Sequence, residues 1–182
     1  YIVYFPSYKY LQDVYAEFVQ AYPDLNVVVQ QNEMTEQARE DFIDLFGENP
    51  EKTLVAFCVL GGIFAEGIDL KGSRLIGTVI VGVGLPQLSV RQNIIKDYFD
   101  GKNNQGFEYA YLYPGMNKVL QAVGRVIRSE SDIGAVLLID DRYGQHSYKR
   151  LLPRHWLPFK KIRTCAELER NLESFWSLFV CR

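Results

Sequence analysis

The sequence has few cysteines and no long apolar run, and both absences exclude classes of protein. Its 182 residues include three cysteines, none in a C-x-x-C pair. A disulfide-stapled secreted domain is therefore excluded, and a reducing, cytoplasmic compartment is predicted. No apolar stretch reaches the ~18–20 residues that a membrane-spanning helix needs, so no membrane partner is expected.

An excess of basic charge is also missing. The chain has 20 Lys and Arg against 22 Asp and Glu, which gives a net charge of −2. This balance excludes a protein that binds nucleic acid through its bulk charge, although a local basic patch remains compatible with it. With 48% hydrophobic residues, the chain has enough apolar surface for one domain with a real core.

The usual phosphate-binding loops are absent as well. There is no G-x-x-x-x-G-K-[ST] sequence, and the G-x-G at Gly82 and Gly84 has Gln87 where a dinucleotide fingerprint needs its third glycine. No cysteine and histidine cluster has the spacing of a metal site, so none is expected. If the chain binds a nucleotide, it does so by other means.

What the sequence does contain is an alternation of apolar strands and amphipathic helices. This order predicts an α/β fold, a doubly wound and mainly parallel sheet with helices on both faces and ligands at the carboxyl ends of the strands. Residues 101–109 are predicted to form an exposed loop. Buried strands are expected at 1–5, 26–30, 53–60, 75–83 and 134–140, and helices at about 8–20, 35–47, 90–99, 116–128 and 166–179.

The segment QAVGRVIRSESD (121–132) is the most informative. On a helix, Gln121, Arg125 and Arg128 share one stripe opposite the apolar residues. Gly124 lies beside this stripe, where a residue without a side chain lets a partner approach closely. Two arginines suit bidentate phosphate binding. The plainer interpretation is a solvated basic face.

Four stretches together resemble one family. QAVGRVIR is similar to motif VI (Q-x-x-G-R-x-x-R) of superfamily-2 helicases, and GGIFAEGIDLKG (61–72) resembles motif V of the XPD/DinG-like branch. VYFPSYKYLQDV (3–14) resembles motif IV, and VGLPQ (83–87) resembles the G-[LV]-P segment of that branch. The stretches follow the family's order over about residues 3–155.

The resemblance implies that residues 1–182 form the second RecA-like domain of a two-domain DNA helicase, with 142–182 as a basic tail and helix. The fold would be P-loop-like without its own Walker A. Because the sequence begins inside a strand and lacks an initiator Met, it is expected to be a piece of a longer chain. ATP and Mg would be bound mainly by the first domain, and an iron–sulfur cluster, if there is one, would also lie in that half.

The resemblance also implies roles for single residues. Arg125 and Arg128 would be arginine fingers toward the ATP γ-phosphate, and Gln121 would position a phosphate or the attacking water. Four residues would lie against the nucleotide: Glu66, Gly67, Asp69 and Gly124. For Glu66 and Asp69, a helix cap or turn acid is the alternative.

Single-stranded DNA is the partner that the resemblance implies for motifs IV and V. Ser7, Tyr8 and the backbone of Gly61 and Gly62 are the candidates, because small residues allow N–H bonds to phosphate. The acid-free stretch 142–163 mixes basic and aromatic residues, which fits a single-strand path. It fits a docking face for the first domain equally well. Its candidate contacts are Lys149, Arg150 and Arg154.

Two other functions compete with the helicase interpretation. VLLIDD (136–141) ends in two acids, as phosphoribosyl-binding strands do, but Arg142-Tyr143-Gly144-Gln145 follows in place of a T-G-rich loop. The second alternative is a non-catalytic interaction module derived from a helicase. The stretch 87–110 is the least family-like and is a candidate for specificity.

Overall fold

The computed structural model describes residues 1–48, 50–66, 68, 70, 72–128 and 132–179. The chain divides into two compact units, residues 1–151 and residues 152–182. All the strands given below and most of the predicted site residues belong to the first unit.

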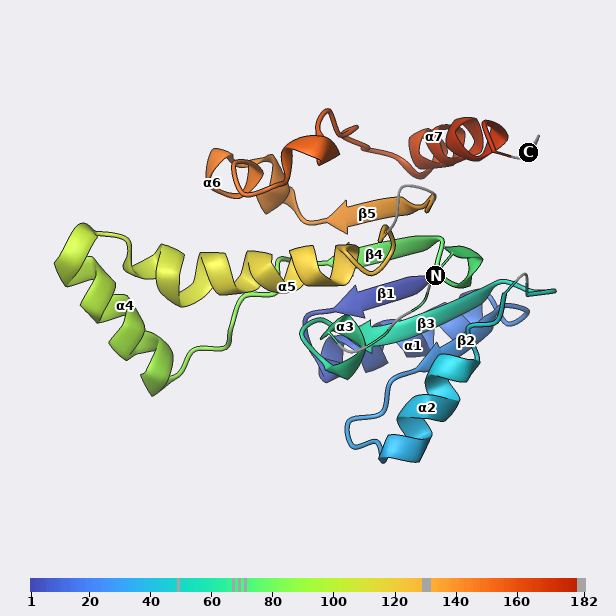
Figure 1. The fold of residues 1–182 in the computed structure, drawn as a ribbon, viewed down its shortest axis with the longest axis horizontal. Helices are drawn as coiled ribbons and strands as arrows, with labels where there is room; N and C mark the ends of the chain where they lie inside the picture. The colour runs from blue at the N-terminus through green and yellow to red at the C-terminus, as the bar shows by residue number, and fades with distance from the viewer. Residues whose placement is uncertain (49, 67, 69, 71, 129–131, 180–182) are drawn as a thin grey trace. The chain divides into compact units, whose positions relative to one another are not determined.

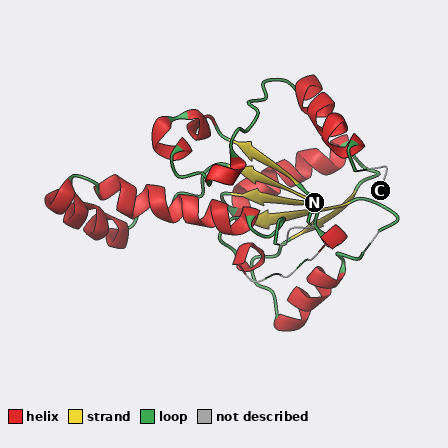
Figure 2. Ribbon diagram, turned by 45° about the horizontal axis from the view of Figure 1, so that its top comes forward, coloured by secondary structure: helices red, strands yellow, loops and turns green. Residues whose placement is uncertain are grey.

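The first unit is built on a five-stranded parallel sheet in which the strands lie in the order β2-β3-β1-β4-β5 (Figure 1). Every strand pair is parallel, so all the strands end at one edge (Figure 2). The predicted parallel α/β fold is confirmed. The strands are β1 (Ile2–Phe5), β2 (Asn26–Val29), β3 (Leu54–Val59), β4 (Gly77–Val81) and β5 (Ala135–Ile139).

Helices cover both faces of the sheet because side chains alternate along each strand. Phe5 and Phe57 pack on one face with Leu11 of α1. Tyr4, the neighbour of Phe5, lies on the other face and donates its hydroxyl to the Phe64 carbonyl in α3, at 2.8 Å. The helices of this unit are α1 (Tyr8–Ala21), α2 (Glu36–Asp44), α3 (Ile63–Glu66), α4 (Val90–Asn103), α5 (Tyr113–Val123) and α6 (His146–Lys149).

Short helical segments complete both units. The first has η1 (Gly72–Arg74), the π-helical η2 (Glu108–Leu112) and η3 (Asp141–Gly144). The second unit has η4 (Arg154–Trp156) and α7 (Cys165–Ser177). Within the second unit, Thr164 caps α7 and Lys160 donates to the Asn171 side chain at 2.6 Å.

The predicted exposed loop at 101–109 is wrong. α4 runs on to Asn103, and η2 already begins at Glu108. Asn104 ends α4 in the left-handed region at φ 56°, and the Asp100 carboxylate accepts the Gly106 N–H at 2.8 Å. A tight turn therefore replaces the loop, and it places the Phe99 and Tyr109 rings in a stack with centroids 3.8 Å apart.

The fifth strand is less buried than its apolar sequence predicts. β5 lies at the edge of the sheet and pairs only with β4. Val136 is 38% exposed and Ile139 is 48% exposed. A continuous apolar run therefore marks a strand here but not one covered on both faces.

The core on the α1 face gives a test of the fold. The Phe57 ring packs against Phe5 and Phe18 with centroid distances of 4.9 and 5.2 Å. We expect Phe57→Ala to lower the free energy of unfolding by about 3–5 kcal/mol, because it empties a filled core. Urea unfolding followed by circular dichroism measures the change. The matched control is Leu88→Ala at an 85% exposed side chain, which should change it by less than about 0.5 kcal/mol; equal losses would contradict this packing.

Candidate functional site

The carboxyl edge of the sheet gathers two of the predicted motifs. Ser7 and Tyr8 follow β1 and Gly61 and Gly62 follow β3, whereas the segment with the two arginines lies between α5 and the amino end of β5. Since parallel strands end at one edge, stretches far apart in sequence meet there. The structure thus places the candidate residues of motifs IV and V on the side where an α/β sheet binds ligands.

The segment that resembles motif V is compact and partly buried. It turns at Gly61, whose φ is +77°, enters the single turn of α3 and then buries Ile68 and Leu70, which are 3% and 1% exposed. Gly67 and Asp69 lie outside the described residues, as does the side chain of Glu66. Their predicted roles stay predictions.

The two arginines fold back onto this segment and do not point outward as a helical stripe would. Arg125 donates from Nε to the Ala65 carbonyl at 3.2 Å and from Nη1 to the Ile68 carbonyl at 3.3 Å. Arg128 also donates from Nη2 to the Ile68 carbonyl. One backbone oxygen therefore receives N–H groups from both guanidiniums, which ties motif VI to motif V.

The predicted helix over 116–128 is wrong at both ends. α5 begins at Tyr113 and stops at Val123, with Gly124 as its C-cap. After it the N–H groups of Arg125 and Val126 bond to carbonyls three residues back, as in a tightened last turn. Val126 is 2% exposed and packs on Gly134, where a side chain could not fit. The α-helix therefore ends where Val126 packs against Gly134.

Gln121 and Gly124 keep exposed positions at the end of α5. Because the helix stops before Arg125, Gln121 is not on a common helical face with the arginines. What the structure brings together is Arg125 and Arg128 on the Ala65–Ile68 backbone.

The candidates after β1 have structural partners. The Ser7 Oγ accepts the Tyr10 N–H at 3.2 Å, which makes Ser7 the N-cap of α1. The Tyr8 hydroxyl accepts from Gln30 Nε2 at 2.8 Å and donates to the Gln31 carbonyl at 3.4 Å. Burial raises the pKa of Tyr8. Both side chains are thus held in place at the edge of the site.

The two glycines after β3 differ in their backbone bonds. The Gly62 N–H donates to the Val59 carbonyl at 2.9 Å, so this N–H is already used. Within the described part of the chain, no acceptor receives the Gly61 N–H. Of the two predicted amides, Gly61 is the one left for a ligand.

Sequence reasoning missed two residues at this edge. Gln30 is 1% exposed and its Oε1 accepts the Val59 N–H at 2.9 Å. Lys118 lies along Gly61, with its Cδ 2.8 Å from where a Cβ of Gly61 would be. Gln30 could have been noticed as a polar residue at the end of the apolar stretch NVVVQ. Lys118 could have been noticed because it lies three residues before Gln121 and so on the same side of the helix.

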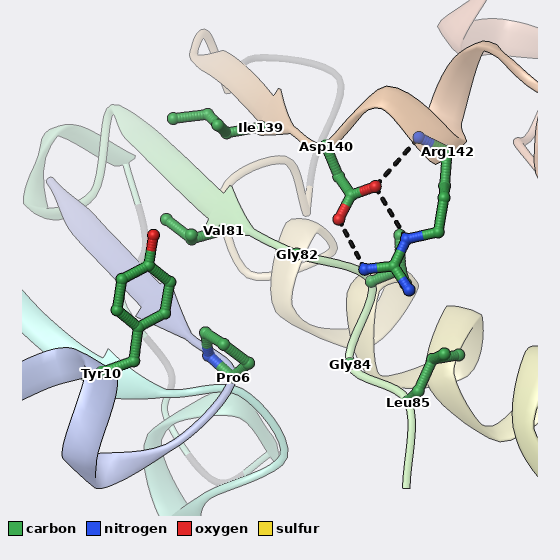
Figure 3. A pocket seen from close by; sticks show the side chains of 10 residues that line it. Pro6, Tyr10, Val81, Gly82, Gly84, Leu85, Ile139, Asp140 and Arg142 are labelled. Carbon is green, nitrogen blue, oxygen red and sulfur yellow. Dashed lines mark hydrogen bonds and ion pairs between the residues drawn. The ribbon is translucent and has the colours of Figure 1, made fainter.

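A hollow of about 350 Å³ lies between the ends of β1, β4 and β5 (Figure 3). Its polar wall is an ion pair, in which Arg142 Nε and Nη2 donate to Asp140 at 2.8 and 2.7 Å. These bonds lower the pKa of Asp140 and raise that of Arg142. The Asp140 carboxylate therefore binds its own neighbour, which weakens the phosphoribosyl-binding alternative.

The predicted basic contacts divide between the two units. Lys149 ends α6 and Arg150 caps it in the first unit. Arg154 begins η4 in the second unit. All three are exposed.

Across the described ranges, no helix is long and apolar enough to cross a membrane. The same part of the chain has no group of three His, Cys, Asp or Glu side chains that could hold a metal ion.

Comparison with known proteins gives consistent matches. A family model for the helicase C-terminal domain matches residues 1–159. ATP-dependent DNA helicase chl-1 of Caenorhabditis elegans is 27% identical over 159 residues, which cover 83% of this chain and 19% of that protein. ATP-dependent DNA helicase DinG of Photobacterium profundum is 32% identical over 103 residues, 56% of this chain and 15% of that protein. An apo XPD structure matches with a TM-score of 0.70 and 25% identity, over 90% of this chain and 32% of that one. The chain spans less than a third of each of these proteins.

The Asp140–Arg142 pair predicts a pH-dependent stability. The pKa of Asp140 is lowered in the fold, so the pair stabilises the protein above the unfolded value of about 3.9. That contribution is lost as the pH falls through the lowered folded pKa. We expect Asp140→Asn to cost roughly 1 kcal/mol at pH 7, because the Arg142 side chain is 39% exposed. Urea unfolding from pH 7 to 2.5 should show the difference shrinking as the pH falls below about 4. A difference that stays constant with pH would rule out this origin.

Proposed function

Because the chain belongs to the helicase C-terminal domain family, we propose that it is the second motor domain of an ATP-dependent DNA helicase of the XPD/DinG type. It would complete an ATP site whose phosphate loop lies on a first motor domain, and it would grip single-stranded DNA. The chl-1 and DinG relatives are named as ATP-dependent DNA helicases. The structural match to apo XPD supports the assignment of the same domain fold.

The convergence of Arg125 and Arg128 on the Ile68 carbonyl carries this proposal. A chain without a phosphate loop of its own still places two guanidiniums beside one backbone segment. Phosphoryl transfer spreads negative charge over the equatorial oxygens, and guanidinium groups suit that charge distribution. The arrangement therefore fits a domain that contributes cations to a nucleotide held elsewhere.

The contacts with the Ala65 and Ile68 carbonyls define what the arginines would do. Backbone carbonyls accept N–H groups in fixed directions, so they orient each guanidinium within the segment. When ATP binds at the first domain, Arg125 and Arg128 would turn donors toward its γ-phosphate. The 65–68 backbone would then change its partners in step with the nucleotide.

The other groups proposed to contact the nucleotide are Gln121 in this domain and Mg²⁺ in the first domain. Gln121 is exposed one turn before Arg125, where its amide would hold a phosphate or the attacking water. We assign Mg²⁺ to the first domain, where it would coordinate the phosphates of the ATP bound there. Any iron–sulfur cluster would belong there too. Mg²⁺ would neutralise phosphate charge during the transfer.

DNA would bind at the opposite end of the same segment. Gly61 follows β3 with a positive φ, and Tyr8 lies at the start of α1 with a fixed hydroxyl. A backbone N–H and an aromatic ring suit the sugar-phosphate chain and a stacked base, respectively. In the first unit, the exposed Lys149 and Arg150 would add charge along the strand. Arg154 of the second unit is a separate candidate contact.

The non-catalytic module remains a second candidate, and turnover separates the two. The test joins this chain to the first motor domain of its protein and measures DNA-stimulated ATP hydrolysis. DNA-stimulated turnover supports the motor role, whereas none in a folded, ATP-bound two-domain protein supports the module. The 182-residue chain alone should hydrolyse no ATP, since half of the site is missing.

Within the joined enzyme, Arg128→Ala should lower kcat by roughly 10³-fold or more, because a guanidinium on the transferring phosphate is worth about 10³–10⁵ in rate. Arg128→Lys should restore little, since an ammonium lacks the planar fork. The matched control is Arg91→Ala, which removes an exposed arginine of α4 and should leave turnover near the wild-type value.

Urea unfolding of each variant separates catalysis from stability, because Arg128 also bonds the Ile68 carbonyl. Near-normal turnover in both Arg125→Ala and Arg128→Ala would refute the arginine-finger assignment.

A further inference from the structure

A half-buried lysine lies directly over the first glycine of the loop after β3. The Lys118 Cδ, Cε and Nζ atoms lie 2.8, 3.0 and 3.3 Å from where a Cβ of Gly61 would be. The ammonium is therefore beside the backbone of Gly61. Among the residues that the structure describes, none forms a hydrogen bond or ion pair with Lys118.

Both glycines of this loop are required by their surroundings. A side chain at Gly61 would be strained at φ +77° and would displace the end of the flexible Lys118 side chain. A side chain at Gly62 would lie 2.9 Å from the Val59 carbonyl oxygen and 3.0 Å from Gln30 Nε2. Lys118 thus lies on one side of the loop and Gln30 on the other.

The buried side chain of Gln30 holds this loop in position through hydrogen bonds. It is 1% exposed, its Oε1 accepts the Val59 N–H and its Nε2 donates to the Tyr8 hydroxyl. One buried amide therefore joins the ends of β2 and β3 to the start of α1. Buried polar groups with satisfied bonds hold a single local geometry.

We propose that Lys118 and the Gly61 N–H form a subsite for a backbone phosphate of single-stranded nucleic acid, on a loop that Gln30 positions. This inference rests on the proposed function and adds Lys118 and Gln30 to it. A cation and a backbone N–H are the donors that a phosphodiester takes. With a net charge of −2, the chain needs such local cations to hold a polyanion.

The phosphate of the strand is favoured over that of ATP by position. The arginines bond to Ala65 and Ile68, whereas Lys118 lies at Gly61, before α3. The Tyr8 ring, which is suited to stacking, is linked to this loop through Gln30. The segment 61–68 would thus bind the strand at one end and the nucleotide through its arginines at the other.

The test measures binding of the 182-residue chain to fluorescein-labelled oligo(dT) of 20 nucleotides, by anisotropy over a range of salt concentrations. Lys118→Met keeps the stem that packs on Gly61 but removes the charge. It should weaken binding roughly fivefold to tenfold at 0.1 M salt and lower the slope of log K against log salt by about 0.7, the value for one phosphate contact on a single strand. Lys118→Arg should retain the slope.

The matched control is Lys52→Met, which removes an exposed charge just before the amino end of β3. It should leave the slope near wild type. Gln30→Met and Tyr8→Phe break the positioning bonds without changing charge, so they should lower affinity while preserving the slope. Urea unfolding confirms that each variant is folded.

The outcomes separate this inference from the proposed function. If wild type binds and Lys118→Met matches Lys52→Met, the subsite is refuted and the helicase proposal stands. If wild type does not bind oligo(dT), both the DNA grip and the subsite fail. If Lys118→Met raises KM for ATP in the joined enzyme while oligo(dT) binding is unchanged, Lys118 serves the nucleotide and the inference is overturned.

Discussion

Two guanidiniums on one short stretch of backbone link the chemistry of this domain to its fold. Arg125 and Arg128 both donate to the Ile68 carbonyl, and Arg125 also donates to that of Ala65. Arginine offers five N–H groups in a planar fork, and the donors now used by the two carbonyls are of the kind that a phosphate would take. Movement of the arginines toward ATP would necessarily change the bonds of residues 65–68.

The other end of this segment lies at the loop after β3. There Gln30 joins the strand ends, and Lys118 covers Gly61. α3 is a single turn between the two ends. A displacement of the Ile68 backbone would therefore be transmitted through only a few residues to the loop at Gly61. Nucleotide state and strand binding would therefore be coupled without a long relay, because they act on the two ends of one short segment.

The sequence predicted the parallel sheet and the N-caps of α1 and α2 well, because apolar runs and Ser or Thr caps are local signals. It failed where tertiary packing decides the outcome. Burial of Val126 against Gly134 ends α5 early, and the Asp100–Gly106 bond replaces a predicted loop with a turn. For the candidate site, helical spacing predicted that Arg125 and Arg128 point outward, but both donate to carbonyls about 60 residues away in sequence. Gln30 and Lys118 were missed because neither belongs to a quoted motif.

The most direct test of the central claim is a crystal structure of the joined two-domain enzyme with ADP–aluminium fluoride and oligo(dT). We predict a guanidinium nitrogen of Arg125 or Arg128 within about 3.2 Å of a fluoride, with the Ala65 and Ile68 carbonyls repartnered. If both arginines keep their bonds to the Ala65 and Ile68 carbonyls while other residues contact the fluoride, the link between the two motifs is purely structural and the central claim is contradicted.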